Sequence, residues 1–311
     1  MSQILAFDEQ TPFTIMRDAV KKHGVKKFYV LLSGGKNSIV VAHFVATNFP
    51  EQFGGCVFTN TGFGSHETRE FVIQYCLEMG WKLFMTWPKE EERFYNVVMR
   101  YGFGGPGNHN LVMGYLKHHS WRQFIADHKV ENPCLISGVF KKESKSREYK
   151  KQYSKKPIDK DGDMIFVKPF FYKTAVQFWD YFMQYKLKKS PTYEWFNKSG
   201  ECFCGCYGNQ WELQLMKEFD PLAFEYIQWL EARIKIRIKE LDEEIIELGR
   251  GIGKNILSQF VHHAKKSKME SLIKNRDDLI NYGTWGHGPT TTDIKAQTLL
   301  DDYCGESCQV T

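Results

Sequence analysis

The sequence contains no apolar run that could cross a membrane, which takes about 18 to 20 consecutive apolar residues. Residues 1–12 have neither the basic segment nor the apolar core of a secretory signal peptide, so we expect a cytoplasmic protein. The sequence also has no internal repeat and no low-complexity tract. Its net charge is only +5, which permits an anionic ligand but does not demand nucleic acid.

The chain does contain enough apolar residues for a globular core, with 42% hydrophobic and 15% aromatic residues. Its 311 residues suit one large domain, or one domain and a smaller C-terminal part. Strand-like runs alternate with helical stretches, which is typical of βαβ units. We therefore predict a doubly wound α/β domain with a parallel sheet over 1–200 and a helical region over 201–311. The expected strands are 27–32, 55–60, 82–86 and 133–137, and the expected helices between the first three are 38–48 and 66–79.

The C-terminal region is expected to contain one long helix. Asp220 is a good N-cap and Pro221 suits the first helical position. An apolar stripe continues to Leu248, and Gly249 is expected to end the helix. Such a stripe favours packing on the core or on a second subunit, so a homodimer is possible. We also predict a helix over 174–185 and a turn over 159–163.

The most informative segment is 30–38, where an apolar strand stops at a pair of glycines and a helical pattern follows. Two glycines let the backbone turn tightly and present its N–H groups to an anion. The dipole of the following helix favours phosphate or sulfate at the same place. A lysine adds positive charge and two serines add hydroxyl donors, although the spacing fits neither the Walker loop nor the dinucleotide fingerprint. The expected anion-binding residues are Ser33, Gly34, Gly35, Lys36, Asn37 and Ser38.

The eight cysteines are expected to be reduced, metal-bound or catalytic in a cytoplasmic protein, rather than paired in disulfides. Five of them form two clusters, and four thiolates suffice for a [4Fe–4S] centre or a tetrahedral zinc. Their spacing is not that of a zinc ribbon. Cys56, Cys76 and Cys134 are isolated and are expected to be buried apolar residues. The candidate metal ligands are Cys202, Cys204, Cys206, Cys304 and Cys308.

Four segments resemble, in order, the motifs of one family. Residues 33–38 are similar to the Ser-Gly-Gly-x-Asp-Ser loop of PP-loop ATP pyrophosphatases and sulfonucleotide reductases, with Asn37 in place of the Asp. Residues 60–68 resemble an Asp-Thr-Gly-x-x-x-x-Glu-Thr segment of the reductases, with Asn60 in place of the Asp. Both replacements remove a negative charge from the motif.

The other two segments extend the resemblance. Residues 101–109 resemble a Gly-Phe-Pro-Gly loop, and residues 138–147 resemble a Gly-x-Arg-x-x-Glu-Ser-x-x-Arg signature with Phe140 in place of the first Arg. From about residue 26 to residue 206 the chain is thus similar to the PAPS-reductase-like members of the adenine nucleotide α-hydrolase superfamily. PAPS is 3′-phosphoadenosine 5′-phosphosulfate, and APS is its analogue without the 3′-phosphate.

The resemblance implies a bound adenine nucleotide, which is ATP, APS or PAPS. It implies that Lys117 lies near the nucleotide and that sulfate or phosphate is held by side-chain donors, cations and backbone amides. It favours a [4Fe–4S] cluster over zinc, with Cys206 as a spare ligand. The further residues implied at the nucleotide are Asn60, Thr61, Gly62, Glu67, Gly138, Lys142, Glu143, Ser144 and Arg147.

Three functions follow from the resemblance. The first is a sulfonucleotide reductase, in which Cys308 or Cys304 attacks the sulfur and a thioredoxin-like thiol donor releases sulfite. The second is an ATP-dependent iron–sulfur sulfurtransferase that adenylates and thiolates a nucleic acid, a possibility favoured by the basic run 141–156. The third is a nucleotide-binding protein without activity, which the replacements at Asn37, Asn60 and Phe140 keep open.

Overall fold

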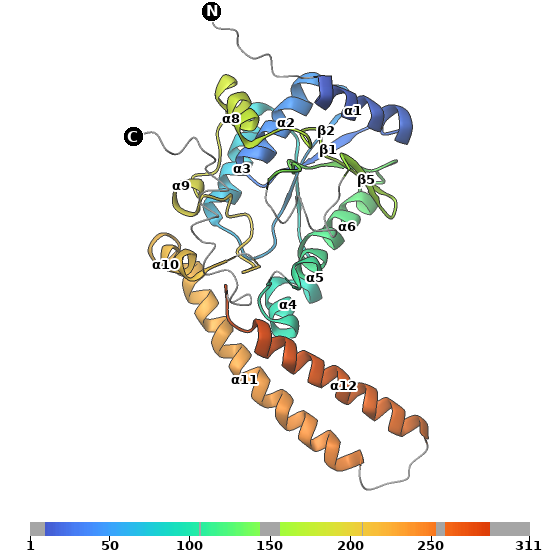
Figure 1. The fold of residues 1–311 in the computed structure, drawn as a ribbon, viewed down its shortest axis with the longest axis vertical. Coiled ribbons are helices and arrows are strands. Elements are labelled where there is room, and N and C mark those ends of the chain that lie inside the picture. The colour runs from blue at the N-terminus through green and yellow to red at the C-terminus, as the bar shows by residue number, and fades with distance from the viewer. Residues whose placement is uncertain (1–9, 106, 144–155, 207, 253–258, 287–311) are drawn as a thin grey trace, which may run out of the picture. The chain divides into compact units, whose positions relative to one another are not determined.

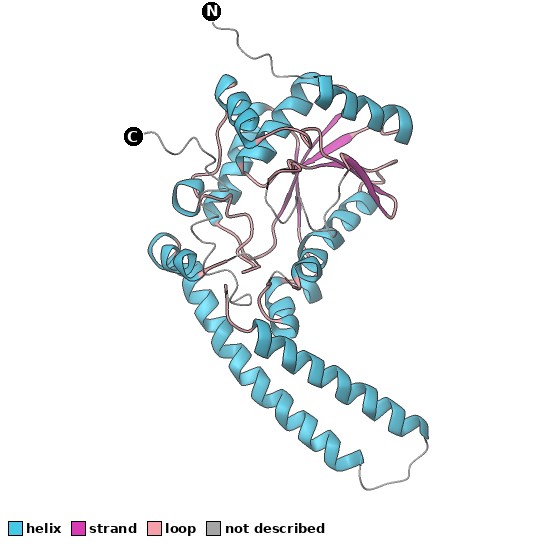
Figure 2. Cartoon of the chain, in the orientation of Figure 1, coloured by secondary structure: helices cyan, strands magenta, loops and turns pink. Residues whose placement is uncertain are grey.

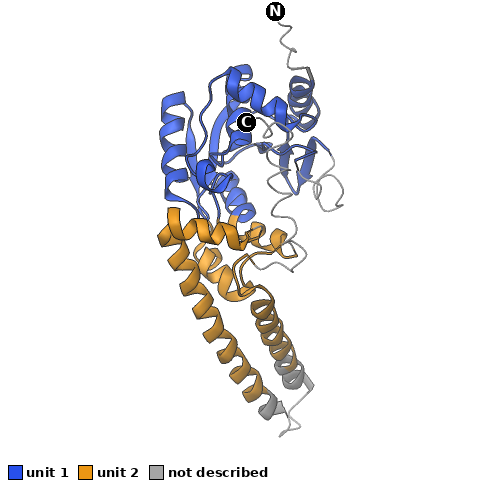
Figure 3. Ribbon diagram, turned by 60° about the vertical axis from the view of Figure 1, so that its left-hand side comes forward, with its two compact units in different colours: residues 1–87, 117–202, 294–311 blue, residues 88–116, 203–293 orange. Residues whose placement is uncertain are grey.

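The computed structural model describes residues 10–105, 107–143, 156–206, 208–252 and 259–286. The chain divides into two compact units, which Figure 3 shows in different colours. Residues up to 87 join 117–202 in the first unit. Residues 88–116 join the segment that begins at 203 in the second unit. A stretch from the middle of the chain therefore belongs with the C-terminal helices.

The first unit is built on a six-stranded sheet with the strand order β3-β2-β1-β4-β6-β5. All neighbouring strands run parallel except β5, which pairs antiparallel with β6. Figures 1 and 2 show helices on both sides of this sheet. The predicted α/β fold with a mainly parallel sheet is confirmed. The strands are β1 (Phe28–Leu31), β2 (Phe53–Thr59), β3 (Leu83–Thr86), β4 (Cys134–Ile136), β5 (Ile158–Asp161) and β6 (Met164–Val167).

Two apolar layers hold the helices of the first unit to the sheet. On one face, α1, α2, α3 and α8 share a single buried cluster with the strands. On the other face, the centre of the Phe124 ring of α6 lies 5.3 Å from that of Tyr29 of β1 and 5.0 Å from that of Phe84 of β3. The helices are α1 (Gln10–His23), α2 (Lys36–Asn48), α3 (His66–Met79), α6 (His119–Asp127), α8 (Ala175–Gln184) and α9 (Tyr193–Phe196).

The expected turn over 159–163 is mostly wrong. Residues up to Asp161 form strand β5, and only Gly162 and Asp163 make the turn to β6. Ladder pairing with β6 and the burial of Lys168 beside Asp159 outweigh the turn propensity of the acidic residues. By contrast, the three isolated cysteines Cys56, Cys76 and Cys134 are buried as predicted.

Strand β1 lies at the centre of the sheet, where the strand order reverses. Its neighbours are β2 on one side and β4 on the other, and both pair with it in parallel. In open α/β sheets ligands bind beyond the carboxyl ends of the strands at such a switch point. The loops that follow β1 and β4 are therefore the expected walls of a binding site.

The second unit is helical. Helices α11 (Pro221–Ile252) and α12 (Gln259–Tyr282) lie side by side, as Figure 1 shows, and both contact α4. Trp285, just after α12, is fully buried and donates its indole N–H to the Phe203 carbonyl at 2.7 Å. The shorter elements are η1 (Glu90–Glu92), α4 (Phe94–Tyr101), α5 (His109–Met113), the π-helical turn η2 (Gly114–His118) and α10 (Gln210–Phe219).

The predicted end of the long helix is wrong by three residues, because α11 continues through Gly249 to Ile252. A glycine inside a helix costs only about 1 kcal/mol relative to alanine, which a long helix tolerates. Among the described residues, no helix is both long and apolar enough to span a membrane.

Candidate functional site

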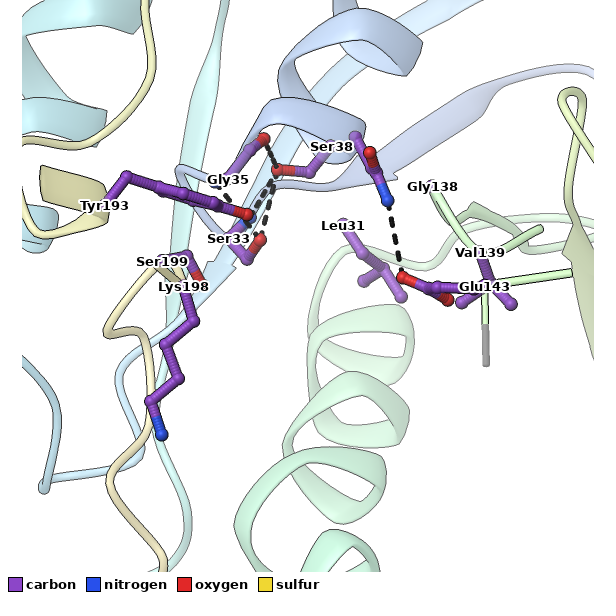
Figure 4. A pocket seen from close by; sticks show the side chains of 11 residues that line it. Leu31, Ser33, Gly35, Ser38, Gly138, Val139, Glu143, Tyr193, Lys198 and Ser199 are labelled. Atoms are coloured by element: carbon purple, nitrogen blue, oxygen red, sulfur yellow. Dashed lines mark hydrogen bonds between the residues drawn. The ribbon is translucent and has the colours of Figure 1, made fainter. Parts of the chain in front are cut away.

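A cavity of about 220 Å³ opens at the carboxyl ends of β1 and β4 in the first unit. The loop after β1 forms one wall, and the loop after β4 forms the opposite wall, as Figure 4 shows. A third wall comes from the segment that contains and follows α9. The residues that line the cavity are Leu31, Ser33, Gly35, Asn37, Ser38, Gly138, Val139, Glu143, Tyr193, Lys198 and Ser199.

The loop after β1 brings the N-terminus of α2 to this cavity. Gly34 has a φ of +78°, a conformation that favours glycine, and Gly35 is the N-cap of α2. No side chain caps the helix at Gly35. The first amides of a helix have no partner within it, so an anion in the cavity can accept hydrogen bonds from them.

Two serine hydroxyls fix the shape of the loop. Ser38 Oγ donates to the Gly35 carbonyl at 2.9 Å and accepts from the Ser33 amide at 3.2 Å. The hydroxyls of Ser33 and Ser38 lie 3.1 Å apart. Figure 4 shows these bonds gathered within the loop. Both serines line the cavity, so they hold the backbone and also present polar atoms to a ligand.

Beneath the loop, a buried cluster of hydroxyls ties three segments together. Thr68 Oγ1 lies 2.7 Å from Ser190 Oγ and 3.0 Å from Thr192 Oγ1, and it donates to the Ser199 carbonyl. The Ser190 amide donates to the Gly34 carbonyl at 2.9 Å. The loop after β1 is thereby locked to the segment that forms the third wall.

Asn37, in the wall formed after β1, donates from its side chain to Glu143 Oε1 of the opposite wall at 3.3 Å. The backbone of Gly138 lies close to Asn37, since a Cβ at Gly138 would come within 2.8 Å of the Asn37 carbonyl. Because Glu143 is a carboxylate, an amide at position 37 can donate to it where an aspartate would repel it. The Asn in place of Asp therefore provides a hydrogen-bond donor to the Glu143 carboxylate.

Lys36 and Phe140 do not line the cavity, and each contacts an aromatic ring. The Lys36 ammonium lies 4.2 Å from the centre of the Trp179 ring, and Lys189 lies 5.2 Å from the same centre. Burial, together with the positive charge of Lys189, lowers the pKa of Lys36 to about 8. The Phe140 ring is buried 5.1 Å from Phe178. Phe140 is thus a core residue here.

The second predicted motif shapes its own loop and does not line the cavity. Asn60 Oδ1 accepts from the Gly62 amide at 3.0 Å, and Glu67 accepts from the Ser65 hydroxyl. Thr61 is buried, with its hydroxyl 3.4 Å from the Phe63 carbonyl. These contacts organise the turn from β2 into α3.

Lys117 forms an ion pair with Glu201 at 2.6 Å, and both side chains are less than one-fifth exposed. The amide of Ser65 donates to the Gly200 carbonyl at 2.7 Å, next to this pair. The segment from Lys198 to Glu201 is therefore held at several points between the cavity wall and the first cysteine of the cluster.

The described cysteines of the cluster differ in exposure. Cys202 and Cys204 are half-buried, whereas Cys206 is buried against Gly104, where an added Cβ would lie 1.9 Å from its sulfur. Within the described residues, no group of three or more His, Cys, Asp or Glu side chains is arranged to hold a metal ion. Ser144, Arg147, Cys304 and Cys308 lie outside the described residues.

Of all the residues predicted at the anion and the nucleotide, six line the cavity. Tyr193, Lys198 and Ser199 also line it, although they were not among the expected ligands. The sequence indicates them only weakly, because their segment lies about 160 residues after the glycine loop and no fixed spacing relates the two. Lys142 is exposed and does not line the cavity. The predicted residues that do so are Ser33, Gly35, Asn37, Ser38, Gly138 and Glu143.

A family model of the phosphoadenosine phosphosulfate reductase domain matches residues 27–199, which is more than half of the chain. The match contains the sheet and every residue that lines the cavity. The chain therefore belongs to the phosphoadenosine phosphosulfate reductase domain family. The predicted family is confirmed. Comparison with curated proteins gives no match.

Solved structures are similar at low sequence identity. PAPS reductase from Candida auris, in a phosphate complex, is 14% identical with a TM-score of 0.43 and covers 62% of this chain and 92% of its own. FMN adenylyltransferase from Candida glabrata, in complex with ATP, is 11% identical with a TM-score of 0.44. That alignment covers 60% of this chain and 57% of the other. At these values the likeness carries no information about activity.

Replacing Gly35 with valine is expected to weaken nucleotide binding at least tenfold, roughly 1.4 kcal/mol. An added Cβ would lie 2.8 Å from the Tyr193 hydroxyl and 3.3 Å from Ser199 Cβ, so the side chain fills the cavity wall. Isothermal titration calorimetry measures the effect. Gly114→Val is the control, because no atom lies within 4 Å of a Cβ at Gly114. Unchanged affinity in a folded Gly35→Val protein would contradict the site.

Asn37→Asp is expected to weaken anion binding about threefold to tenfold, because it places a second negative charge on the cavity wall, next to Glu143. The Asn37→Asp/Glu143→Gln double variant should recover most of the lost affinity, since the repulsion is removed. The same titration, run on both variants and on Glu143→Gln alone, gives the coupling between the two positions. Equal losses in the single and double Asp variants would show that Glu143 does not face position 37.

Proposed function

We propose that the cavity binds the phosphate or sulfate groups of an adenine nucleotide and that the protein reduces a sulfonucleotide, APS or PAPS, to sulfite. The observation that supports this most is the uncapped N-terminus of α2, which opens into a polar cavity within the reductase-family domain. Backbone amides and hydroxyls there suit a tetrahedral anion. The nearby cations Lys36 and Lys198 add favourable charge.

In this proposal a cysteine thiolate, Cys308 or Cys304, attacks the sulfur of the bound sulfonucleotide. A sulfur–sulfur bond forms, the bond from sulfur to the phosphate oxygen breaks, and the electron pair leaves with AMP or with its 3′-phosphorylated form. A thioredoxin-like dithiol then attacks the cysteine sulfur and releases sulfite. The dithiol supplies two electrons and becomes a disulfide.

The loop after β1 would act on the leaving phosphate. Its amides and hydroxyls are held before the substrate arrives by Ser38 and by the buried hydroxyl cluster, so they need little reorganisation. Lys117 is proposed to lie near the nucleotide, as the family resemblance implies. Its ammonium is also paired with Glu201, which immediately precedes Cys202. Lys117 would therefore connect the nucleotide site with the cysteine segment.

A second candidate function is an ATP-dependent sulfurtransferase that adenylates and thiolates a nucleic acid. Lys141 and Lys142 support it, because both are exposed beside the wall that contains Glu143. In that reaction the nucleotide site would bind the phosphates of ATP, and pyrophosphate would leave. A protein that binds the nucleotide without reacting is the third candidate.

The products separate these functions. The protein, prepared without oxygen, is incubated separately with ATP, APS and PAPS in the presence of a thioredoxin system. Sulfite from APS or PAPS is the expected result, and it should disappear in whichever of Cys304→Ser and Cys308→Ser removes the nucleophile. Pyrophosphate from ATP with an RNA acceptor would favour the sulfurtransferase, and binding without either product would favour the inactive protein.

For the sulfurtransferase, in which Cys304 and Cys308 do not supply the nucleophile, we propose that the cysteines bind a [4Fe–4S] centre, with Cys202, Cys204, Cys304 and Cys308 as ligands. Thiolates are the donors such a centre takes, and Cys202 and Cys204 are half-buried whereas Cys206 is sealed against Gly104. Cys206 is then the spare residue. Trp285, just after α12, donates to the Phe203 carbonyl, beside Cys204. Zinc on the same thiolates is the alternative.

Protein purified without oxygen should be brown, with the broad visible absorption of thiolate-to-iron charge transfer. Cys204→Ala and Cys308→Ala should each remove this colour, whereas Cys206→Ala should keep it. Because the cluster would close a long loop of chain, its loss should also make the tail more sensitive to protease. Visible absorption and metal analysis measure the outcome. A colourless wild type with one zinc per chain would contradict the iron–sulfur proposal.

A further inference from the structure

Helix α11 carries an apolar face that its own unit does not bury. Leu222, Trp229 and Ile236 are 78%, 48% and 45% exposed, and they recur every seventh residue. Residues seven apart lie on the same face of a helix. The buried face of α11 is a different stripe, made of Ile227, Leu230, Ile234 and Leu241, which belongs to the core of the unit. The exposed residues are therefore not needed to hold α11 against α12.

Tyr226 and Arg233 complete a heptad pattern between the exposed residues. We call the five residues Leu222, Tyr226, Trp229, Arg233 and Ile236 the α11 seam. Their alternating spacing of four and three residues is that of the contact positions in a two-stranded coiled coil. Beyond Ile236 the pattern reaches Glu240, which is paired with Arg237 at 3.1 Å, so the seam ends there.

Aromatic contacts within the chain fix the centre of the seam. The Trp229 ring stacks on Tyr226 with centroids 5.7 Å apart and an angle of 14° between the planes. It also lies 5.6 Å from the Tyr95 ring of α4. An exposed tryptophan held in one orientation loses little side-chain freedom when a partner covers it, which favours binding.

We propose that the α11 seam packs antiparallel against the same seam of a second copy of this chain. The antiparallel register places Trp229 opposite the partner's Arg233 and Tyr226 opposite the partner's Ile236. A guanidinium over an indole face is a favourable pair. The twofold axis makes each contact occur twice, as a closed symmetric dimer requires.

The charges beside the seam support this orientation. Glu225 and Lys239 are both exposed on the edge of the seam, and neither has an ion-pair partner among the residues that the structure describes. The antiparallel register brings Glu225 to the partner's Lys239. A parallel pair would instead place Arg233 opposite the partner's Arg233, which like charges disfavour.

The size of the seam predicts a weak dimer. In this register Leu222 lies opposite the partner's Glu240, at the end of the contact, and the two seams overlap from Tyr226 to Ile236, about 15 Å of helix. Two such seams bury less surface than a standard stable interface. We therefore expect a concentration-dependent equilibrium with a dissociation constant of about 1 to 100 µM.

Sedimentation velocity of the full chain, with reductant present to prevent disulfides, tests the proposal. The wild type should change from monomer to dimer across that concentration range. Trp229→Ala should weaken the dimer at least tenfold, and so should Glu225→Lys and Lys239→Glu. The double charge reversal Glu225→Lys/Lys239→Glu should restore dimerisation, because the opposite charges meet again.

Lys235→Glu is the matched control, since Lys235 is exposed on the same helix but lies away from the seam. It makes the same change of charge as Lys239→Glu and should leave the dimer intact. The charge variants alter exposed residues, so they stay informative even if Trp229→Ala disturbs the contact with Tyr95. A monomer at every concentration, or a dimer whose dissociation constant does not change in Glu225→Lys and in Lys239→Glu, would overturn the proposal.

Discussion

The candidate site depends on one constraint, which is that the first amides of α2 must face a cavity at the carboxyl end of the central strand. Gly34 makes this possible by adopting a positive φ, and Ser38 holds the turn through the Gly35 carbonyl. No side chain caps the helix there. A capping side chain would accept hydrogen bonds from the first amides of the helix. We propose that a bound anion accepts them here, so these amides are available to a ligand.

The surrounding structure holds the loop after β1 in this position. Thr68, Ser190 and Thr192 form a buried hydroxyl cluster that fastens the loop from below. Asn37 contacts Glu143 of the opposite wall through a neutral amide donor and not through a second charge. The segment that follows Thr192 lines the cavity at Ser199 and continues, past the ion pair of Lys117 and Glu201, into Cys202. The cavity wall and the first group of cysteines, Cys202 to Cys206, are therefore parts of one short stretch of chain.

Sequence patterns predicted the parts of the fold that depend on residues close together in the chain. Apolar runs and glycine stops were enough for β1 to β4 and for α2 and α3, the helices between the first three strands, because each element buries a continuous face. The glycine loop at 33–38 was predictable for the same reason. The turn over 159–163 was predicted too wide, since hairpin pairing with the adjacent strand β6 extends β5 to Asp161. Tyr193 and Ser199 reach the cavity only through tertiary contacts, and no spacing in the sequence indicates them.

The most direct test of this account is hydrogen–deuterium exchange of the backbone amides, measured with and without saturating APS, PAPS or ATP. The account predicts that a bound nucleotide slows exchange at residues 33–38, where the amides would bind its phosphate or sulfate, with a smaller effect at Lys198 and Ser199. A nucleotide that binds but leaves the amides of 33–38 exchanging at the same rate would contradict it.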